Sequence, residues 1–226
     1  LKKTNFYPIL IETLWLLRGE PDISFLKKHG VNHWDSWATD GQLGRVYGVQ
    51  WRDWKTCHTP TKKVRHTDQI TELIRGMRAD PHGRRHMVTA WNPGELDQMA
   101  LPPCHYGFQC HISAQGVVSM IVNMRSVDLL IGLPYDLAMY AILLHMIAIV
   151  IGRKPGKLRF NFGSTHIYNN HLEHVPELLA REPKPAPSLS VDSDAAKFMD
   201  LDSFDPESFV LHGYESHPFI KLPVAV

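Results

Sequence analysis

The longest apolar run of the sequence, LAMYAILLHMIAIVI at residues 137–151, is the feature that most constrains the fold. A segment that is apolar on all sides has to be buried, so we predict a long core helix over these residues. The run is interrupted by His145 and is too short to span a bilayer comfortably, so we expect no membrane span. Asp136 stands directly before the run, where its position favours an N-cap that bonds the free N–H groups of the first turn.

The segments on either side of this run show helical or strand-like periodicity. Helices are predicted over FYPILIETLWLLRGE (ending near Gly19), DISFLKKHG (capped by Asp22), HTDQITELIRGMRADP (closed by Asp80-Pro81) and HLEHVPELLAR. Strands are predicted over GRRHMVTAWNP, over HYGFQCHISAQGVVSMIVNMRSVDLLIG with a turn near 114–116, and as a pair around KLRFNFGSTHIY. VNHWDSWATDGQLGRVYGVQWRDW is predicted to be a loop that carries binding groups, and the tail from PKPAPSLSVD is predicted to be mostly strand or coil.

Length and periodicity together narrow the class of fold. At 226 residues the chain is expected to form one domain, over 1–226, that buries its core without disulfides or a structural metal. We predict an α+β fold with a mixed sheet and packed helices. The chain starts at Leu1 inside a patterned segment, without Met or a visible signal peptide, so we expect that N-terminal residues are missing.

Charge and cysteine usage exclude several kinds of partner. With 24 basic and 23 acidic residues, we expect no general attraction to nucleic acid or membrane, and any anion needs a local cluster. The three cysteines cannot all pair and none lies in a C-x-x-C motif, which favours the reducing cytoplasm. His166, His171 and His174 have a spacing that matches no common zinc pattern, so we predict no metal and expect solvated or hydrogen-bonding histidines.

Cys104 is the strongest candidate nucleophile. It follows Pro102 and Pro103, which stiffen the chain, and His105 stands beside it. A thiolate in this setting can attack an electrophilic carbon, and the alternative is a buried structural cysteine. Glu12, inside the apolar LIETLWLL, is predicted to have a raised pKa suited to proton transfer, unless it lies on the polar side of its helix.

Two pairs of polar residues form a candidate anion clamp. Arg84 and Arg85 lie in GRRH, and Arg125 and Ser126 lie in NMRS. Guanidinium groups and a hydroxyl group can bind one phosphate together. The alternative is solvated surface charge.

Ordered motifs along nearly the whole chain resemble the thymidylate synthase family. They are IETLWLLRGE, HWDSWATDGQLGRVYGVQWRDW, DQI, GRRHMVTAWNPGELDQMALPPCH, RSVDLLIGLPYDLAMYAILLHMIA, GSTHIYNNH and SHPFIKLPVAV. The resemblance implies an α+β fold that forms a homodimer back to back through its sheet, with a pyrimidine nucleotide and 5,10-methylenetetrahydrofolate as small-molecule ligands. It also implies that a missing N-terminal portion carries one further phosphate-binding arginine.

The resemblance assigns a role to individual residues of this sequence. Cys104, beside His105, resembles the nucleophile that adds to C6 of the pyrimidine, and Glu12 resembles the glutamate that manages protons through an ordered water. For the nucleotide, the implied contacts are Arg125, Ser126, Asp128, His166 and Tyr168, with Gln109 behind the nucleophile, Tyr47 near the reacting centre, and Arg84 and Arg85 lent by the neighbouring subunit. For the folate, they are His33, Trp34, Trp37, Asp128, Ile131, Gly132, Tyr135 and the terminal Val226.

Asp136 departs from the thymidylate synthases, which have asparagine at this position. The asparagine amide accepts from uracil N3–H and donates to O4, whereas cytosine has the reverse pattern. A protonated aspartic acid can donate to N3 and accept from the amino group, and an ionised one can do the same with a protonated N3. A uracil would leave buried partners unmatched, at about 1–3 kcal/mol each. Asp136 therefore predicts a cytosine nucleotide, and the N-cap remains only as a secondary role.

The same change from asparagine to Asp136 is typical of the cytidylate hydroxymethylases. The segment GSTHIY also resembles that branch, because it has Ser164 where many thymidylate synthases have Asp. Water capture of the one-carbon unit gives 5-hydroxymethyl-(d)CMP and tetrahydrofolate, whereas hydride transfer from the folate gives a methylated base and dihydrofolate. Trp34 and the KLPVAV tail resemble a site that excludes water, which favours hydride transfer, and the polar ring of His33 favours water. We predict the hydroxymethyltransferase, with C5 methylation of dCMP, or of dUMP as in the synthases, as the alternative.

A third hypothesis is a catalytically silent relative that binds a nucleotide or RNA. It is disfavoured by the intact set of Cys104, Glu12 and the arginines. The sugar stays open, although Arg84 and Ser126 keep the pattern of the synthases and favour dCMP over CMP.

Overall fold

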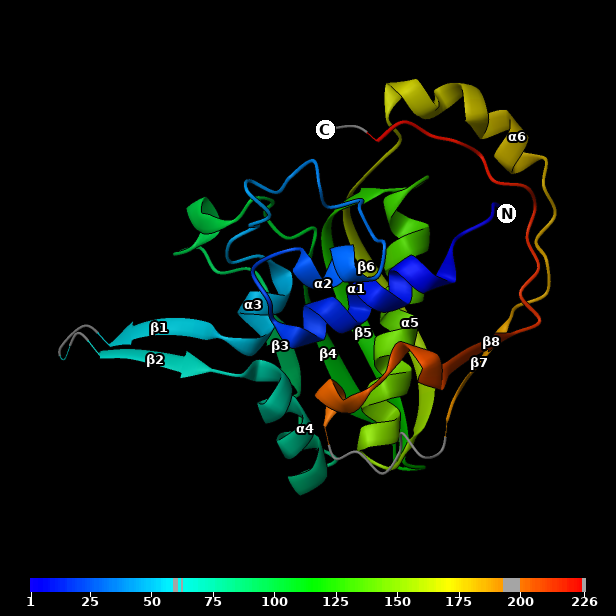
Figure 1. The fold of residues 1–226 in the computed structure, drawn as a ribbon. Coiled ribbons are helices and arrows are strands. Elements are labelled where there is room, and N and C mark those ends of the chain that lie inside the picture. Colours follow the sequence, from blue (N-terminus) through cyan, green and yellow to red (C-terminus); the bar gives the residue numbers. More distant parts are fainter. Residues whose placement is uncertain (59–60, 62, 193–199, 225–226) are drawn as a thin grey trace.

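A mixed four-stranded sheet forms one layer of the protein. The computed structural model describes residues 1–58, 61, 63–192 and 200–224. The sheet order is β3 (Met87–Thr89), β4 (His105–Ile112), β5 (Val117–Asp128) and β6 (Lys154–His166), with β3, β4 and β5 antiparallel and β6 parallel to β5. The predicted mixed sheet is confirmed (Figure 1).

The predicted strand pair around KLRFNFGSTHIY is wrong, because this segment belongs to one 13-residue strand. β6 follows β5 from the pair Val117–Lys154 to the pair Asp128–His166, with a shift of register between Val118 and Met120, so β5 supplies ladder partners along one edge of this strand. Gly163 allows the close approach of the two strands, since a Cβ there would lie 2.8 Å from the Arg125 carbonyl oxygen.

Two helices, α1 (Phe6–Arg18) and α5 (Gly132–Val150), lie on one side of this sheet: α5 packs on β5 and β6, and α1 packs on α5 (Figure 1). α1 ends as predicted at Gly19, which has φ 65° in the left-handed region that favours glycine. α5 starts at Gly132, five residues before the predicted start. Asp136 therefore lies inside the helix, and its predicted N-cap role is wrong.

The carboxylate that bonds the N–H groups at this end of α5 belongs to Asp128. It accepts from the N–H of Leu130 at 3.1 Å and from the N–H of Gly132 at 3.2 Å. Asp128, the last residue of β5, therefore bonds the N–H groups that Asp136 was predicted to bond, and the side chain of Asp136 is available for another contact.

α5 is also longer than the sequence predicted, and its 19 residues are apolar enough to cross a membrane by length and composition. The argument that this segment is too short for a membrane span is therefore wrong. In the fold, however, the helix packs on α1, β5 and β6, and Tyr140, Met146, Ile147 and Ala148 are fully buried. It is the central helix of the core.

Three shorter helices precede the sheet. They are α2 (Ser24–Lys28), α3 (Tyr47–Arg52) and α4 (Gln69–Ala79). α2 is capped at Ile23 rather than at Asp22, although the Asp22 carboxylate accepts from the Ser24 N–H at 2.8 Å. α4 is confirmed where the sequence predicted a helix closed by Asp80-Pro81, and its N-cap is Asp68.

α3 lies in a segment that was predicted to be a loop. It forms because Tyr47, Val49 and Trp51 are buried against the core, which the absence of a clean period in the sequence concealed. Gly48 permits its close packing on α1, since a Cβ there would lie 2.3 Å from the carbonyl oxygen of Leu16. The close approach places Tyr47 beside the start of β4.

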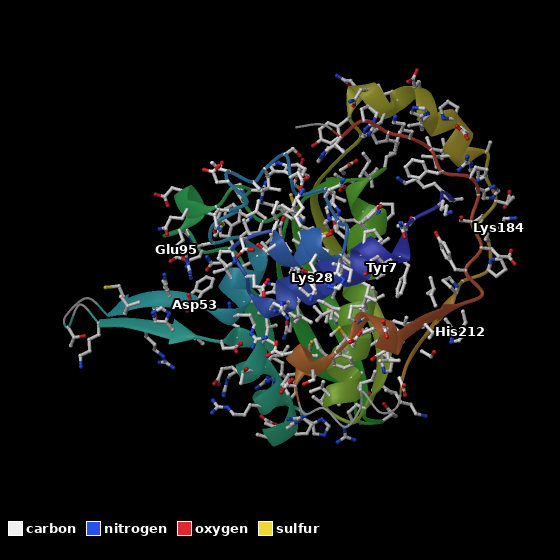
Figure 2. All side chains as sticks on the ribbon, in the orientation of Figure 1. Tyr7, Lys28, Asp53, Glu95, Lys184 and His212 are labelled. Atoms are coloured by element: carbon white, nitrogen blue, oxygen red, sulfur yellow. The ribbon has the colours of Figure 1, made fainter. Side chains whose placement is uncertain are left out.

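The remaining elements are peripheral. β1 (Trp54–His58) and β2 (Lys63–Thr67) form a hairpin that projects from the body (Figure 1). At its base, Arg45 donates to Asp53 at 2.9 Å and to Glu95 at 2.6 Å, and both acceptors are labelled in Figure 2. The C-terminal part contains η2 (Asn169–His174), α6 (Val175–Leu179), and the paired strands β7 (Ser188–Val191) and β8 (Phe209–His212); three further short helical turns are η1 (Leu96–Gln98), η4 (Leu201–Ser203) and η5 (Pro206–Ser208).

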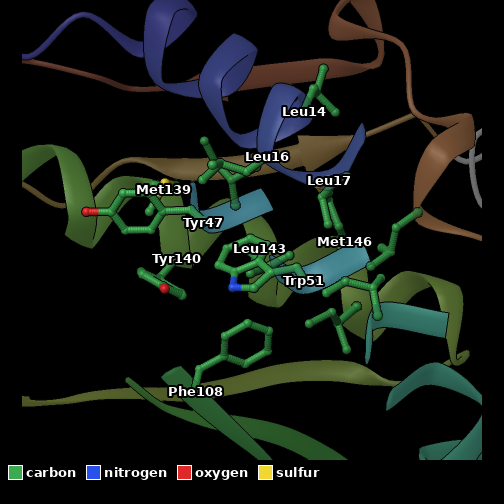
Figure 3. Packing of buried hydrophobic residues seen from close by; sticks show 14 of the residues in the cluster. Leu14, Leu16, Leu17, Tyr47, Trp51, Phe108, Met139, Tyr140, Leu143 and Met146 are labelled. Atoms are coloured by element: carbon green, nitrogen blue, oxygen red, sulfur yellow. The ribbon is translucent and has the colours of Figure 1, made fainter. Parts of the chain in front are cut away.

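A continuous apolar core connects α1, α3 and α5 with the sheet. Figure 3 shows Trp51 of α3 between the leucines of α1 and α5 and the ring of Phe108 on β4. The ring centroids of Trp51 and Phe108 are 5.6 Å apart, and those of Phe108 and Tyr140 are 5.9 Å apart, both in edge contacts. This packing fixes the position of α5, and with it Tyr140 and Asp136, relative to β4.

Candidate active site

Cys104 lies directly before β4, in a segment that four hydrogen bonds hold in place. Its N–H donates to the hydroxyl oxygen of Tyr47 at 2.8 Å, and its carbonyl accepts from the N–H of Arg125 at 2.8 Å. The guanidinium of Arg125 donates to the carbonyls of Pro103 and Pro102, at 2.8 Å each. The two prolines therefore present their carbonyl oxygens to one side chain, which fixes the thiol beside Tyr47 and Arg125.

The three cysteines of the chain are free and differ in environment. Burial raises the pKa of the Cys110 thiol to about 12, so this thiol stays protonated at neutral pH. Burial also raises the pKa of Cys104, while the charge of Arg125 acts in the opposite direction. Cys57 is exposed on the projecting hairpin. Cys104 is therefore the half-buried thiol that has a cation beside it.

His105, the first residue of β4, is held between two tyrosines. Its ring centroid lies 4.3 Å from that of Tyr47, and its Nδ1 lies 2.8 Å from the hydroxyl oxygen of Tyr140. Burial lowers the pKa of His105 to about 4, against the opposing charge of Glu12. The imidazole is therefore neutral at pH 7.

Asp136 projects from α5 toward this histidine. Its Oδ1 lies 3.8 Å from Nε2 of His105. Burial, together with the negative charges of Glu12 and Asp128, raises the pKa of Asp136 well above its ordinary value. The same α5 packing that buries Tyr140 thus places a carboxyl group that favours its neutral form near Cys104.

Glu12 of α1 has both carboxylate oxygens bonded by rings. Oε2 lies 2.8 Å from Nε2 of His33, and Oε1 accepts from the indole N–H of Trp34 at 2.7 Å. Burial acts to raise the pKa of Glu12, but the charge and hydrogen bond of His33 and the bond from Trp34 outweigh it and lower the pKa. The predicted raised pKa of Glu12 is therefore wrong, because the sequence did not reveal these donors.

His33 does not simply face solvent. Burial acts to lower its pKa, but the charge of Glu12 and the hydrogen bond between them raise it. The ring also lies edge-on to Tyr135, with centroids 6.4 Å apart. The lowered pKa of Glu12 and the raised pKa of His33 both favour the ion pair between these two side chains.

Aromatic rings form a wall beside the Glu12–His33 pair. Trp34 contacts Trp37 at 5.7 Å and Tyr47 at 6.1 Å between ring centroids, both edge-on. Trp34 is buried, whereas Trp37 and Tyr135 are half-buried and present ring surface. This side of the Glu12–His33 pair is therefore lined by aromatic ring surface.

The carboxyl ends of β5 and β6 carry the polar residues predicted to bind a nucleotide. Ser126 is paired with Ser164, and Asp128 with His166. Tyr168 follows, with its ring 5.0 Å from that of His166. These residues lie at the edge of the sheet where β4 begins, so the structure brings them to the same edge as Cys104.

Four predicted site residues lie outside this cluster. Arg84 and Arg85 precede His86, whose carbonyl accepts the Cys110 N–H at 2.8 Å. They therefore lie roughly 20 Å along β4 from Cys104, at about 3.3 Å per residue. Gln109 lies on β4, five residues from Cys104, where it is paired with Met87 on β3 and Ile121 on β5. Val226 is outside the described residues.

The histidines of the H-x4-H-x2-H segment have separate partners. His171 is buried, with Nε2 2.7 Å from the carbonyl oxygen of Pro223, and His174 lies 3.6 Å from Glu173. Within the part of the chain that the structure describes, no group of three or more His, Cys, Asp or Glu side chains is arranged to hold a metal ion.

Tyr140 is a site residue that the sequence analysis missed. Its hydroxyl contacts His105, although the residue is fully buried in the apolar run that predicted the core helix. A phenol within such a run needs a polar partner, which was the available signal.

Comparison with known families gives a match over the whole chain. The family model described as "Thymidylate synthase" matches residues 1–226.

Proposed function

Because the chain belongs to the thymidylate synthase family, we propose that it transfers the one-carbon unit of 5,10-methylenetetrahydrofolate to C5 of a cytidine monophosphate nucleotide, dCMP or CMP, and forms 5-hydroxymethyl-(d)CMP. One-carbon transfer from methylenetetrahydrofolate to a pyrimidine nucleotide is the reaction of the family, and its members function as dimers. The choice of cytosine and of the hydroxymethyl product is our proposal. The observation that carries it is the buried carboxyl group of Asp136, which lies 3.8 Å from His105, the residue that follows Cys104.

Cys104 is the proposed nucleophile. Its thiolate adds to C6 of the pyrimidine, and the electron pair of the C5–C6 bond moves to C5. Arg125 favours the thiolate by its charge, and its hydrogen bonds to Pro102 and Pro103 keep the sulfur in place. When bound, the folate supplies the one-carbon unit that C5 takes up.

Asp136 is the proposed reader of the base. A carboxyl group that favours its neutral form can donate to cytosine N3 and accept from the amino group. Its burial makes an unmatched partner costly, at about 1–3 kcal/mol. We assign the phosphate to Arg125 and Ser126, and the sugar to His166 and Tyr168.

Glu12 and His33 support the hydroxymethyl product. After one-carbon transfer, loss of the C5 proton and departure of tetrahydrofolate with the electron pair of the carbon–nitrogen bond leave a methylene group on C5. The oxygen of water can attack this group. The C–O bond forms as the methylene π electrons move into the ring, and they then restore the C5–C6 double bond as the bond from C6 to Cys104 breaks. The proton of the water passes to the Glu12 carboxylate, which is bonded by His33 at 2.8 Å and lies in a polar rather than a fully apolar setting. No oxidation or reduction is involved.

C5 methylation with the folate as hydride donor is the second candidate function. It is favoured by Trp34, which is buried and packed edge-on against Trp37 and Tyr47. A wall of this kind excludes water. Both candidates use the same nucleophile and the same base reader, and we place the reaction in the cytoplasm because the three cysteines are free.

The test uses dCMP, CMP and dUMP, each tritiated at C5 and each incubated with methylenetetrahydrofolate. We expect tritium release from a cytosine nucleotide and a product mass that shows an added hydroxymethyl group. Asp136→Asn should shift the preference toward dUMP by about 5- to 150-fold, the equivalent of about 1–3 kcal/mol. Asp97→Asn, an exposed change, is the matched control and should leave the preference unchanged.

Each outcome decides one part of the proposal. Preferred turnover of dUMP by the unmodified protein would refute the cytosine assignment. An added methyl group, with dihydrofolate formed in step, would decide for the second candidate. An unchanged preference in Asp136→Asn would contradict the role given to this residue.

A further inference from the structure

Arg84 and Arg85 are adjacent, exposed arginines whose guanidinium groups form no hydrogen bond or ion pair within the part of the chain that the structure describes. Arg45, Arg52 and Arg125 differ, because each of them donates to carboxylates or carbonyls of its own chain. Two guanidinium groups on neighbouring residues suit an anion such as a phosphate. With no side-chain partner to hold them, their placement depends on the backbone that carries them.

That backbone is a short loop between α4 and β3. α4 ends at its C-cap Asp80, and β3 begins at Met87. The N–H of Gly83 donates to the Asp80 carbonyl at 2.9 Å, and the N–H of Met87 donates to the Arg85 carbonyl at 2.9 Å. A Cβ on Gly83 would lie 2.9–3.0 Å from atoms of Asp80 and of the His86 ring. The loop is therefore tightly closed, with no room for a side chain at Gly83.

His86 ties the end of this loop to its beginning. Its side chain is buried, and its Nε2 lies 2.9 Å from the carbonyl oxygen of Asp80. A carbonyl oxygen only accepts, so the Nε2–H of His86 is the donor. The backbone carbonyl of His86 accepts from the N–H of Cys110 at 2.8 Å, and its Nδ1 would lie 3.4 Å from a Cβ on Gly76. The imidazole thus connects the last turn of α4 with the sheet.

We propose that His86 is a positioning residue, which holds the loop of Arg84 and Arg85 in the arrangement that binds a nucleotide phosphate in a second copy of the chain. Both arginines lie roughly 20 Å along β4 from Cys104, at about 3.3 Å per residue, so the phosphate is that of the neighbouring site. The inference deepens the proposed function and rests on it, because it needs a nucleotide at that site. It does not depend on which base the site selects.

The test is a double-mutant cycle on nucleotide affinity. Calorimetry measures the dissociation constant of dCMP or dUMP, whichever the unmodified protein binds more tightly. His86→Leu should weaken binding by about five- to tenfold, since the loop then spends less time in the competent arrangement. In the variant that carries Arg84→Ala and Arg85→Ala, the further change His86→Leu should alter the constant by less than about twofold. An equal loss in both backgrounds would overturn the inference, because the effect would not pass through the arginines.

Two variants serve as controls. His86→Gln keeps a side-chain N–H donor and should restore most of the affinity that His86→Leu loses. His217 makes the same kind of bond elsewhere, with Nε2 2.8 Å from the carbonyl oxygen of Glu182. His217→Leu should therefore leave the affinity within about twofold of that of the unmodified protein.

A second variant disturbs the same contact from the other side. Gly83→Ala leaves His86 in place, but its methyl group would lie 3.0 Å from both the Asp80 carbonyl oxygen and Cε1 of His86. It should weaken nucleotide binding in the unmodified background and have little effect when the arginines are absent. In the unmodified protein, 15N NMR of labelled histidine should show a hydrogen on Nε2 of His86. A ring without that hydrogen would overturn the inference even if His86→Leu does not fold.

The outcomes separate this inference from the proposed function. If the unmodified protein neither binds nor turns over a cytosine nucleotide, the proposed function fails. If it does both, and His86→Leu and Gly83→Ala bind the nucleotide within about twofold of the unmodified protein, the inference alone fails.

Discussion

Two carboxyl groups near His105, those of Glu12 and Asp136, have pKa values shifted in opposite directions, and their partners explain the difference. Burial acts to raise both pKa values. Glu12 receives hydrogen bonds from His33 and Trp34, which stabilise the carboxylate. Asp136 has negative neighbours and no charged donor as close as 3 Å among the described residues. At the scale of the residue, one group is therefore prepared to accept a proton and the other to donate one.

The Cys104 thiol gives a pH prediction at this scale. Since burial raises its pKa, the thiolate fraction is smaller than that of a free cysteine at any pH below that pKa. The experiment uses the Cys57→Ser variant without nucleotide and follows alkylation of Cys104 by iodoacetamide. The rate should be low at pH 7. It should keep rising with pH past the range in which the alkylation rate of a free thiol levels off. Intact mass over time measures the rate.

The control for this experiment is Asp136→Asn. The ionised carboxylate of Asp136 raises the pKa of Cys104, so Asp136→Asn should speed alkylation at those pH values at which Asp136 is ionised. Cys110 should stay unmodified in the folded protein. A rate at pH 7 equal to that of a free cysteine would contradict the pKa direction.

At the scale of the element, the contact between α1 and α3 positions Tyr47. Gly48 lies against the backbone of Leu16, at a place where a side chain has no room. Tyr47, the residue before it, bonds the N–H of Cys104 at 2.8 Å. The same close packing that stabilises the helix pair thus fixes the backbone of the nucleophile.

Gly48→Ala should destabilise the protein by about 1–3 kcal/mol, because the added methyl group would lie 2.3 Å from the Leu16 carbonyl oxygen and must force the helices apart. Urea denaturation at a fixed protein concentration measures the free energy of unfolding. Gly94→Ala is the control, since its nearest contact would be 3.6 Å away, and its effect should stay within about 0.5 kcal/mol. Equal stability of the two variants would show that α3 can shift without cost.

At the scale of the whole molecule, the sheet is covered by α1 and α5 on one face, while residues along β6 are exposed or half-exposed (Figure 1). Arg84 and Arg85 lie near the far end of β4, roughly 20 Å from Cys104 at about 3.3 Å per residue. They cannot reach a phosphate held beside Cys104 of their own chain. We propose that a second copy, paired through the sheet, receives these arginines at its site.

Heterodimers test this shared site. One chain carries Cys104→Ser and its partner carries Arg84→Ala with Arg85→Ala, and two affinity tags isolate the mixed species. If the arginines are lent across the interface, one of the two sites is complete and about half of the activity per dimer returns. Tritium release from the nucleotide measures it.

The reverse arrangement is the control. One chain carries all three changes and the other is unmodified. Shared arginines predict no activity here, since one site lacks its thiol and the other lacks the partner's arginines. Half activity in this arrangement, with none in the first, would show that each chain supplies its own arginines.

The sequence by itself determined which segments are helices and strands wherever one period dominates, and it determined the chemical types at the site. The apolar run at residues 137–151 predicted the core helix, Gly19 ends α1, and Cys104 after two prolines is the residue that we propose as the nucleophile. Local patterning suffices for these because they depend on neighbours within one or two turns of chain.

Only the tertiary structure decided how these groups behave. The pKa of Glu12 is lowered by His33 and Trp34, which lie about twenty residues away along the chain. Asp136 is no cap, because Asp128 at the end of β5 bonds the first N–H groups of α5. Hydrogen bonds, charge and burial between distant segments set these properties, since each depends on distances of a few ångströms that the order of residues does not contain.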